Sequence, residues 1–266
     1  MNPDRTTPSP ERHVPECRRD VEQTRRHNTA VCVFVLNEGE KIRTQLRRMR
    51  GVTDVADIVV ADGGSTDGAL DKALLRETGV HALLVKTGPG GLSAQMRMAF
   101  DFCLEQGFDG VVTMDGNNKD DPESVPGFVN LLNKGYDHIQ GSRFLPGGGH
   151  EHTPRIRWAA IRWFHAPLIS RAAGFRYTDT TNGFRAYSRR LLTDPRTQPF
   201  REVFSAYELH YYLAIRAPRL GFRVIETPVT RRYPPAGPLP SKISPFRGNM
   251  RVLCTLIKAV TGRYDP

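Results

Sequence analysis

The chain has 266 residues, of which 39% are hydrophobic and 25% are charged, and its formal net charge is +10. A chain of this length and apolar content can bury a substantial core, so one α/β domain accounts for it without a second. The cationic excess would suit nucleic acid, but the sequence contains no helix-turn-helix pattern, zinc-ligand spacing or aromatic-interleaved sheet motif. We therefore expect no nucleic-acid partner.

The cysteine pattern and the lack of long apolar runs indicate the compartment. No run approaches the roughly 18 consecutive apolar residues of a membrane span. The four cysteines are scattered and form no Cys-X-X-Cys pair, and Cys32 and Cys103 fall on predicted buried faces. This pattern is typical of reduced core thiols. The sequence thus predicts a cytoplasmic protein, either dissolved or peripheral on the inner face of the membrane.

The first 28 residues differ in composition from the rest of the chain. They contain few apolar side chains, four prolines and mixed charges. Such a segment cannot bury enough apolar surface to order itself, and it lacks the apolar core of a secretory signal. We expect a disordered basic leader over residues 1–28, a folded domain over 29–245, and a C-terminal amphipathic helix with a tail over 246–266.

Two apolar runs of strand type follow the leader and end in polar clusters. Residues 30–36 end at Asn37-Glu38, and residues 57–61 end at the segment 62–67, which contains Asp62 and Asp67. Each run is followed by apolar residues at helical spacing. This alternation predicts an α/β fold with parallel strands, whose carboxyl ends meet at the edge of the sheet where ligands bind.

A third apolar run, residues 110–114, stops at Asp115-Gly116-Asn117. Side chains two residues apart point to the same side of an extended segment, so Asp115 and Asn117 could hold a divalent cation through hard oxygen ligands. The alternative is a strand followed by an Asx-rich turn, with Asp121-Pro122 opening a helix. The recurrence of the pattern at three strand ends favours a binding site.

Two long stretches, residues 152–178 and 227–264, carry cations but no acid. Each also has apolar residues at helical spacing, and Pro167 is expected to kink or break the first helix. Basic amphipathic helices suit peripheral contact with an anionic membrane. The alternative is that the apolar faces pack on the sheet and the cations are solvated.

Short motifs stand in a fixed order along the chain: Val33-Phe-Val-Leu-Asn37-Glu38, Asp62-Gly-Gly-Ser-Thr-Asp67, Gly91-Leu-Ser-Ala-Gln95, Asp115-Gly-Asn117, Asp121-Pro-Glu123, Gly141-Ser-Arg143, Asp179-Thr-Thr-Asn-Gly-Phe-Arg185 and Ser241-Lys242. In this order they resemble the inverting glycosyltransferases of family 2, and among them the dolichyl-phosphate mannosyltransferase and polyprenyl-phosphate sugar synthase branch. The resemblance extends over most of the chain, and a set of ordered motifs is far more specific than any single one.

The resemblance implies a single glycosyltransferase-A-type, Rossmann-like domain with a mostly parallel central sheet flanked by helices, here assigned to residues 29–245. It implies a nucleotide-sugar donor, with UDP, GDP or dTDP as the nucleotide, and Mg²⁺ or Mn²⁺ held by Asp115 and Asn117. Asp115 is then also a catalytic residue. The donor-binding residues that the resemblance indicates are Asn37, Glu38, Asp62, Gly91, Asp115, Gly116 and Asn117.

Four positions depart from the family pattern. Phe34 stands where the first motif usually has a proline, Gly63 where the nucleobase motif has its second aspartate, Asn117 where the metal motif has its second aspartate, and Lys119 where a glutamine is common. Asn117 retains an oxygen ligand but loses a charge. Lys119 would either repel a metal ion or neutralise the diphosphate in its place, and both alternatives stay open.

The resemblance also implies the acceptor. The predicted function is transfer of the sugar to a polyprenyl (dolichyl-type) phosphate, with Arg143, Arg232 and Lys242 gripping the phosphate. A phosphomonoester is largely ionised at pH 7 and needs no strong base. Family members with hydroxyl acceptors place a catalytic base where Glu208 stands, so a soluble small-molecule acceptor in a biosynthetic pathway is the alternative.

Two further classes of protein are less favoured. A nucleotidyltransferase would need a glycine-rich cationic loop after the first strand, and a dinucleotide-binding fold would need its G-x-G-x-x-G turn there. The segment 37–40 is Asn-Glu-Gly-Glu instead. A catalytically silent nucleotide-sugar-binding homologue is suggested by Asn117 and Lys119 in the metal motif.

Overall fold

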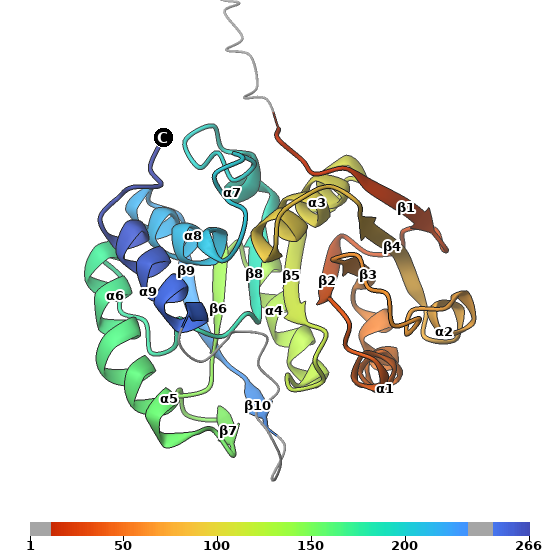
Figure 1. Cartoon of the computed structure of the whole chain (residues 1–266), viewed down its shortest axis with the longest axis horizontal. Helices are drawn as coiled ribbons and strands as arrows, with labels where there is room; N and C mark the ends of the chain where they lie inside the picture. Colours follow the sequence, from red (N-terminus) through yellow and green to blue (C-terminus); the bar gives the residue numbers. More distant parts are fainter. Residues whose placement is uncertain (1–11, 234–246) are drawn as a thin grey trace, which may run out of the picture.

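A central sheet runs through the computed structural model, which describes residues 12–233 and 247–266 (Figure 1). Within these residues the sheet has eight strands, in the spatial order β1 (Cys17–Val21), β4 (Val80–Lys86), β3 (Asp57–Asp62), β2 (Thr29–Val35), β5 (Gly110–Asp115), β8 (Arg185–Ser188), β6 (His138–Ser142) and β9 (Val224–Pro228). A separate two-stranded sheet pairs β7 (Gly149–Glu151) with β10 (Thr230–Arg232).

Most neighbouring strands of the large sheet are parallel. β4, β3, β2 and β5 pair in parallel, as do β6 and β9, whereas β1 and β8 run antiparallel to their neighbours. All seven residues of β2 are buried, as expected for a parallel strand that is covered on both faces. The predicted α/β fold with a mostly parallel central sheet is confirmed.

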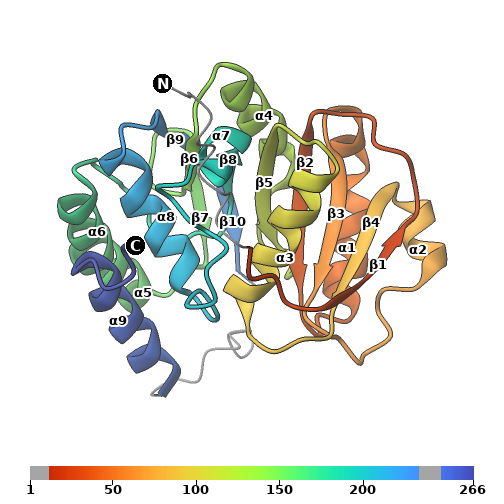
Figure 2. The same cartoon turned by 90° about the horizontal axis from the view of Figure 1, so that it is seen from above.

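Helices cover both faces of the sheet (Figure 2). In chain order they are α1 (Glu40–Arg48), η1 (Met49–Asp54), α2 (Lys72–Glu77), α3 (Leu92–Glu105), η2 (Pro122–Ser124), α4 (Val125–Asn133), α5 (Arg155–Ala160), η3 (Ile161–His165), α6 (Ala166–Ala173), α7 (Arg189–Thr193), α8 (Glu208–Arg219) and α9 (Arg247–Val260). None of the helices in the described ranges combines the length and hydropathy that crossing a bilayer requires.

The alternation of side chains along the strands divides the core into two layers. Val31 and Val33 of β2 pack in the layer that contains α1, α2 and α4, whereas Cys32 packs in the layer that contains α3 and α8. In this second layer the thiols of Cys32 and Cys103 are buried and lie 3.6 Å apart. The prediction of buried thiols at these two positions is therefore correct, whereas Cys254 is exposed.

The predicted disorder of residues 1–28 is wrong for residues 12–28. Residues 17–21 form β1, which pairs antiparallel with β4, and Arg12 contacts Asp101 at 2.9 Å. An edge strand is held by backbone hydrogen bonds and tolerates charged side chains, so its sequence lacks the apolar pattern of an inner strand. Residues 1–11 lie outside the described residues.

The first acid-free stretch folds as one helical segment rather than two separate helices. α5 continues through the π-turn η3 into α6, and Pro167 stands in the first turn of α6. A π-turn widens the backbone and accommodates the carbonyl that a proline leaves without a donor. The helical segment therefore continues past Pro167 without the predicted break. Trp163 and Phe164 within the π-turn are exposed.

Candidate active site

Three neighbouring strands bring several predicted donor-binding residues to one edge of the sheet. The end of β2 pairs with Asp62 of β3 on one side and with Asp115 of β5 on the other. The chain order of the strands reverses at β2, and ligands bind beyond the carboxyl ends of the strands at such a switch point. Asp62, Asp115 and the loop after β2 therefore lie together.

Asn37 and Asp62 order the loops that follow their strands. Asn37 has a left-handed backbone (φ 47°), and its Oδ1 accepts a hydrogen bond from the backbone N–H of Thr66 at 2.8 Å. The buried carboxylate of Asp62 accepts from the backbone N–H and the hydroxyl of Ser65, the latter at 2.5 Å. Asn and Asp suit such turns because their side chains bond nearby backbone. The two loops are thus tied together beside the strand ends.

Two other acids of this edge have local partners. Asp67 accepts a hydrogen bond from the backbone N–H of Gly39 at 2.8 Å, and Glu38 forms an ion pair with Lys41 at 3.7 Å. Carboxylates that gather at one edge require donors or cations, because their like charges repel. Here the loops themselves supply part of that compensation.

Gly63 lies against a side chain of α3. A Cβ at position 63 would lie 3.0 Å from Nε2 of Gln95, a buried amide on α3. That amide donates to the carbonyl oxygens of Val35 and Ala61 at 3.0 and 3.1 Å. Gln95 therefore joins the ends of β2 and β3, and a side chain at 63 would require its amide to shift.

Gly91 is committed to a structural contact at the start of α3. Its N–H donates to the carbonyl oxygen of Ser205 at 2.8 Å, and Ser93 donates to that of Ala206. These bonds tie α3 to the loop before α8. The sequence assigns Gly91 to donor binding, but the structure engages its amide with this loop.

Asp115 is held by an arginine from a distant part of the chain. Nη2 of Arg231 in β10 donates to Oδ2 of Asp115 at 2.9 Å, and Nη1 donates to both carboxylate oxygens of Asp120 at 2.7 Å. Burial alone would lower the pKa of Arg231, but Asp120 and Asp115 raise it, so the guanidinium is cationic. Sequence reasoning did not connect Arg231 or Asp120 with this site.

The rest of the Asp115-Gly-Asn motif turns sharply around the end of β2. A Cβ at Gly116 would lie 2.8 Å from a methyl group of Val35, so only glycine fits there. The amide nitrogen of Asn117 lies 3.4 Å from Oδ2 of Asp115, and Oδ1 of Asn117 accepts from the backbone N–H of Lys119 at 3.3 Å. The buried ammonium of Lys119 lies 5.1 Å from the centre of the Tyr233 ring.

Oδ2 of Asp115 accepts from Arg231 and Oδ1 of Asn117 accepts from the backbone N–H of Lys119, so a Mg²⁺ or Mn²⁺ ion held by these two side chains would need further oxygens from a ligand. Among residues 12–233 and 247–266, no cluster of three His, Cys, Asp or Glu side chains could hold a metal by itself. Magnesium is commonly held by one or two carboxylates together with the phosphates of a substrate. The donor set therefore suits a cation that a diphosphate helps to bind.

Arg143 is not a free cation. Its Nε and Nη2 bond the two carboxylate oxygens of Asp179 at 2.6 and 2.9 Å, and Nη2 also donates to the hydroxyl of Thr181. Both members of the pair are almost completely buried. Asp179 engages two of the five N–H donors of the guanidinium and Thr181 a third, so Arg143 is tied to the protein, and its role in binding phosphate stays a prediction.

The other two cations predicted to bind the acceptor are Arg232 and Lys242. The exposed guanidinium of Arg232 pairs with Glu151 at 3.1 Å, which joins β10 to β7. Lys242 lies outside the described residues.

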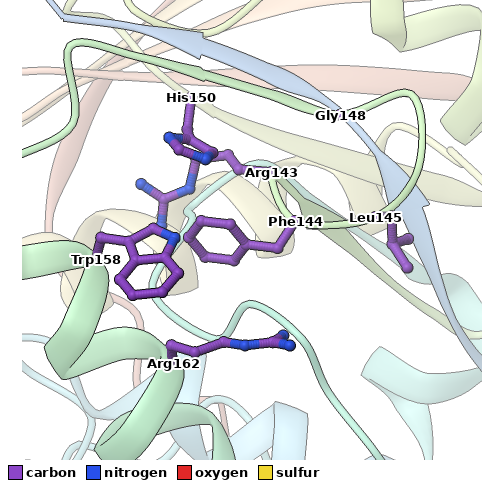
Figure 3. A pocket seen from close by; sticks show the side chains of 7 residues that line it. All are labelled: Arg143, Phe144, Leu145, Gly148, His150, Trp158 and Arg162. Carbon is purple, nitrogen blue, oxygen red and sulfur yellow. The ribbon is translucent and has the colours of Figure 1, made fainter. Parts of the chain in front are cut away.

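A pocket lies beside the β7–β10 ribbon and the helical segment 155–173 (Figure 3). It has a volume of about 350 Å³ and is lined by Arg143, Phe144, Leu145, Gly148, His150, Trp158 and Arg162. Figure 3 shows the indole of Trp158 and the ring of Phe144 between the side chains of Arg143 and Arg162. The pocket thus combines cationic groups with aromatic surface.

Glu208 stands at the start of α8, where its Oε2 accepts a hydrogen bond from the backbone N–H of Ala206 at 2.6 Å. The preceding Tyr207 lies within electrostatic reach of the site: burial raises its pKa, and the charge of Asp115 adds to that rise. His210 is a buried core residue, and its burial together with the nearby Arg185 lowers its pKa well below the ordinary value. The carboxylate of Glu208 is therefore bonded to the loop that precedes α8.

Comparisons with known proteins identify similar sequences. The profile of the family described as Glycosyl transferase family 2 matches residues 30–194. The undecaprenyl-phosphate mannosyltransferase of Micrococcus luteus is 32% identical over 198 residues, which are 73% of this chain and 79% of that protein. The polyprenol monophosphomannose synthase of Mycolicibacterium smegmatis is 30% identical over 207 residues, which are 76% of this chain and 76% of that protein.

A solved structure shares the fold. It is glucosyl-3-phosphoglycerate synthase from Mycobacterium tuberculosis, in complex with Mn²⁺, UDP-glucose and phosphoglyceric acid. The two chains superpose with a TM-score of 0.64 and 18% sequence identity, over 88% of this chain and 79% of that one.

Proposed function

Because this chain belongs to glycosyl transferase family 2 and is a glycosyltransferase, we propose that it moves a sugar from a nucleoside diphosphate to a polyprenyl phosphate, with inversion at the anomeric carbon. Two relatives at 30% identity or more carry polyprenol or undecaprenyl phosphate in their names. The single observation in the structure that supports this acceptor is the pocket of Figure 3, which joins cations to aromatic surface.

In this proposal the donor lies across the carboxyl ends of β2, β3 and β5. The nucleobase lies against Asp62 and the loop after β2, and the diphosphate lies at Asp115. A bound Mg²⁺ or Mn²⁺, held by Asp115 and Asn117, would neutralise the leaving diphosphate. A solved structure of the same fold contains Mn²⁺ together with UDP-glucose, which supports a divalent cation in donor binding. Arg231, which contacts Asp115, adds a fixed positive charge to the same place.

The acceptor phosphate supplies its own nucleophile. A phosphomonoester has a second pKa of about 6, so one of its oxygens is an anion at pH 7 and can attack the anomeric carbon without a base. The pocket's cation Arg162 would hold the phosphate, while Trp158 and Phe144 contact the first isoprene units. The neighbouring helix exposes Ile156 and Trp163 by 85% and 75%, which suits peripheral contact of the protein with an anionic bilayer.

The pocket can be tested by substitution. Arg162→Gln and Trp158→Ala should each reduce the apparent affinity for a short-chain polyprenyl phosphate about ten-fold, because a charge-assisted contact or a buried aromatic contact is lost. Hydrolysis of the nucleotide-sugar donor should stay nearly unchanged. Arg155→Gln is the matched control, because this exposed cation begins the same helix without lining the pocket.

Rapid transfer to a hydroxyl acceptor, dependent on Glu208 and indifferent to Arg162, would contradict the lipid-phosphate proposal. That result would support the soluble-acceptor alternative, in which the carboxylate of Glu208 leaves the N–H of Ala206 and acts as the base.

Asp62 offers a test of the donor. Asp62→Ala should raise the donor KM about ten-fold or more while changing kcat little, since a nucleobase contact remote from the reaction is made equally in the ground and transition states. Steady-state kinetics measures both constants. Ser65→Ala is the control, because it removes the hydroxyl that orders the loop and leaves the carboxylate in place. A fall in kcat with unchanged KM would place Asp62 away from the nucleobase.

A further inference from the structure

Arg231 is fixed between two carboxylates that differ in exposure. Asp120 is completely buried and receives Nη1, whereas the side chain of Asp115 is 30% exposed and receives Nη2. The contact with Asp115 thus lies on the open side of the arginine, and the contact with Asp120 anchors it from behind.

The backbone holds this arginine in register with the metal motif. Arg231 and Asp120 form an isolated β-bridge, and the backbone N–H of Arg232 donates to the carbonyl oxygen of Lys119 at 2.8 Å. The guanidinium is therefore kept beside Asp115 by elements other than Asp115 itself. If another cation binds the carboxylate of Asp115, Arg231 stays in place and its Nη2 lies next to that cation.

We infer that Arg231 is a positioning residue that occupies Asp115 in the empty site and makes divalent-cation binding conditional on a nucleoside diphosphate. This inference rests on the donor site of the proposed function and goes beyond it, because it predicts strong cooperativity between cation and nucleotide.

Electrostatic repulsion explains why the divalent cation would need a nucleoside diphosphate in order to bind. A divalent cation that arrives alone must displace Nη2 from Oδ2 of Asp115 and then lies beside the positive charge of Arg231. Like charges at such short range disfavour binding in a partly buried site. A nucleoside diphosphate brings phosphate oxygens that can accept from Nη2 and also ligate the cation. The nucleotide thereby removes both obstacles at once.

The test measures Mn²⁺ binding by electron paramagnetic resonance, without acceptor and without transfer. The wild-type protein should bind Mn²⁺ about ten-fold or more tightly in the presence of UDP or GDP, whichever of the two binds, than in its absence. Asp115→Asn identifies the signal that belongs to this site. Equal affinity with and without nucleotide would overturn the inference.

A charge-balanced variant tests whether the cooperativity between Mn²⁺ and nucleotide depends on Arg231. Asp120→Asn combined with Arg231→Gln replaces the buried ion pair with a neutral hydrogen-bonding pair, so no fully buried charge is left unpaired and the partly exposed carboxylate of Asp115 is released. This variant should bind Mn²⁺ alone about ten-fold or more tightly than the wild type, and its gain from nucleotide should shrink correspondingly. Arg231→Lys, which keeps the charge beside Asp120 but cannot span both carboxylates, should shift the affinity in the same direction.

Arg232→Gln is the matched control, because it removes the adjacent cation, which pairs with Glu151 rather than with Asp115. Its Mn²⁺ affinity should equal that of the wild type. If the charge-balanced variant binds Mn²⁺ no more tightly than the wild type, or if Arg232→Gln tightens binding equally, the inference is wrong. Because no arm uses transfer, an unexpected acceptor would leave these outcomes interpretable.

Discussion

Replacing Asp115 by alanine is expected to lower the rate of sugar transfer about a thousand-fold. The carboxylate is proposed to position the cation at the leaving diphosphate, and a preorganised electrostatic group of this kind is worth about 10² to 10³ in kcat. Loss of Asp115 also releases Nη2 of Arg231, which then lacks its partner on the open side of the site. The measurement is single-turnover transfer to a short-chain polyprenyl phosphate, with circular dichroism as the check on folding.

Asp121→Ala is the matched control, because it removes a carboxylate from the same segment that pairs with Arg48 and not with Arg231. It should reduce transfer far less than Asp115→Ala. Retention of more than about a tenth of the rate in Asp115→Ala would show that another group neutralises the diphosphate. In that case Lys119→Ala should cost more than Asn117→Ala, which would favour the lysine over a metal ion.

The sequence predicts the strands of the site well because parallel strands are buried on both faces. β2, β3 and β5 therefore appear as continuous apolar runs, and the polar residues that end them mark the edge where Asp62 and Asp115 lie. β1 escapes prediction because its side chains are largely charged and its stability comes from backbone pairing with β4. The hydrophobic pattern of a sequence indicates which residues are buried, and few residues of an edge strand are buried.

Long-range polar pairs are the part of the site that sequence reasoning misses. Arg231 lies 116 residues from Asp115, and Arg143 lies 36 residues from Asp179. Neither spacing follows a helical or strand period, so no pattern distinguishes an arginine that binds substrate from one that pairs inside the protein. Arg231 also belongs to a segment rich in other cations, so the sequence does not mark it as the buried one.

The buried pair of Arg143 and Asp179 supports the last prediction, which concerns stability. Arg143→Ala leaves the completely buried carboxylate of Asp179 without its partner, and removing one member of a buried pair costs about 3 to 5 kcal/mol. Asp179→Ala should cost a similar amount, because it leaves the guanidinium unpaired. Urea unfolding at pH 7 measures both changes as a lower midpoint.

The double substitution and the pH dependence distinguish this pair from a surface contact. Arg143→Met combined with Asp179→Leu should recover much of the lost stability, since replacing both charges with apolar groups is often neutral or stabilising. Burial would raise the pKa of Asp179, but Arg143 and its hydrogen bonds outweigh burial and hold that pKa below the ordinary value.

The stabilisation from Asp179 is therefore fully present above the ordinary carboxyl pKa of about 4 and is lost as the pH falls toward the lowered pKa of the folded state. The urea midpoint of the wild type should fall more steeply below pH 4 than that of the double variant. Equal slopes, or a loss of less than about 1 kcal/mol in Arg143→Ala, would mean that the pair is solvated like a surface ion pair. Arg143 would then be available to the acceptor phosphate after all.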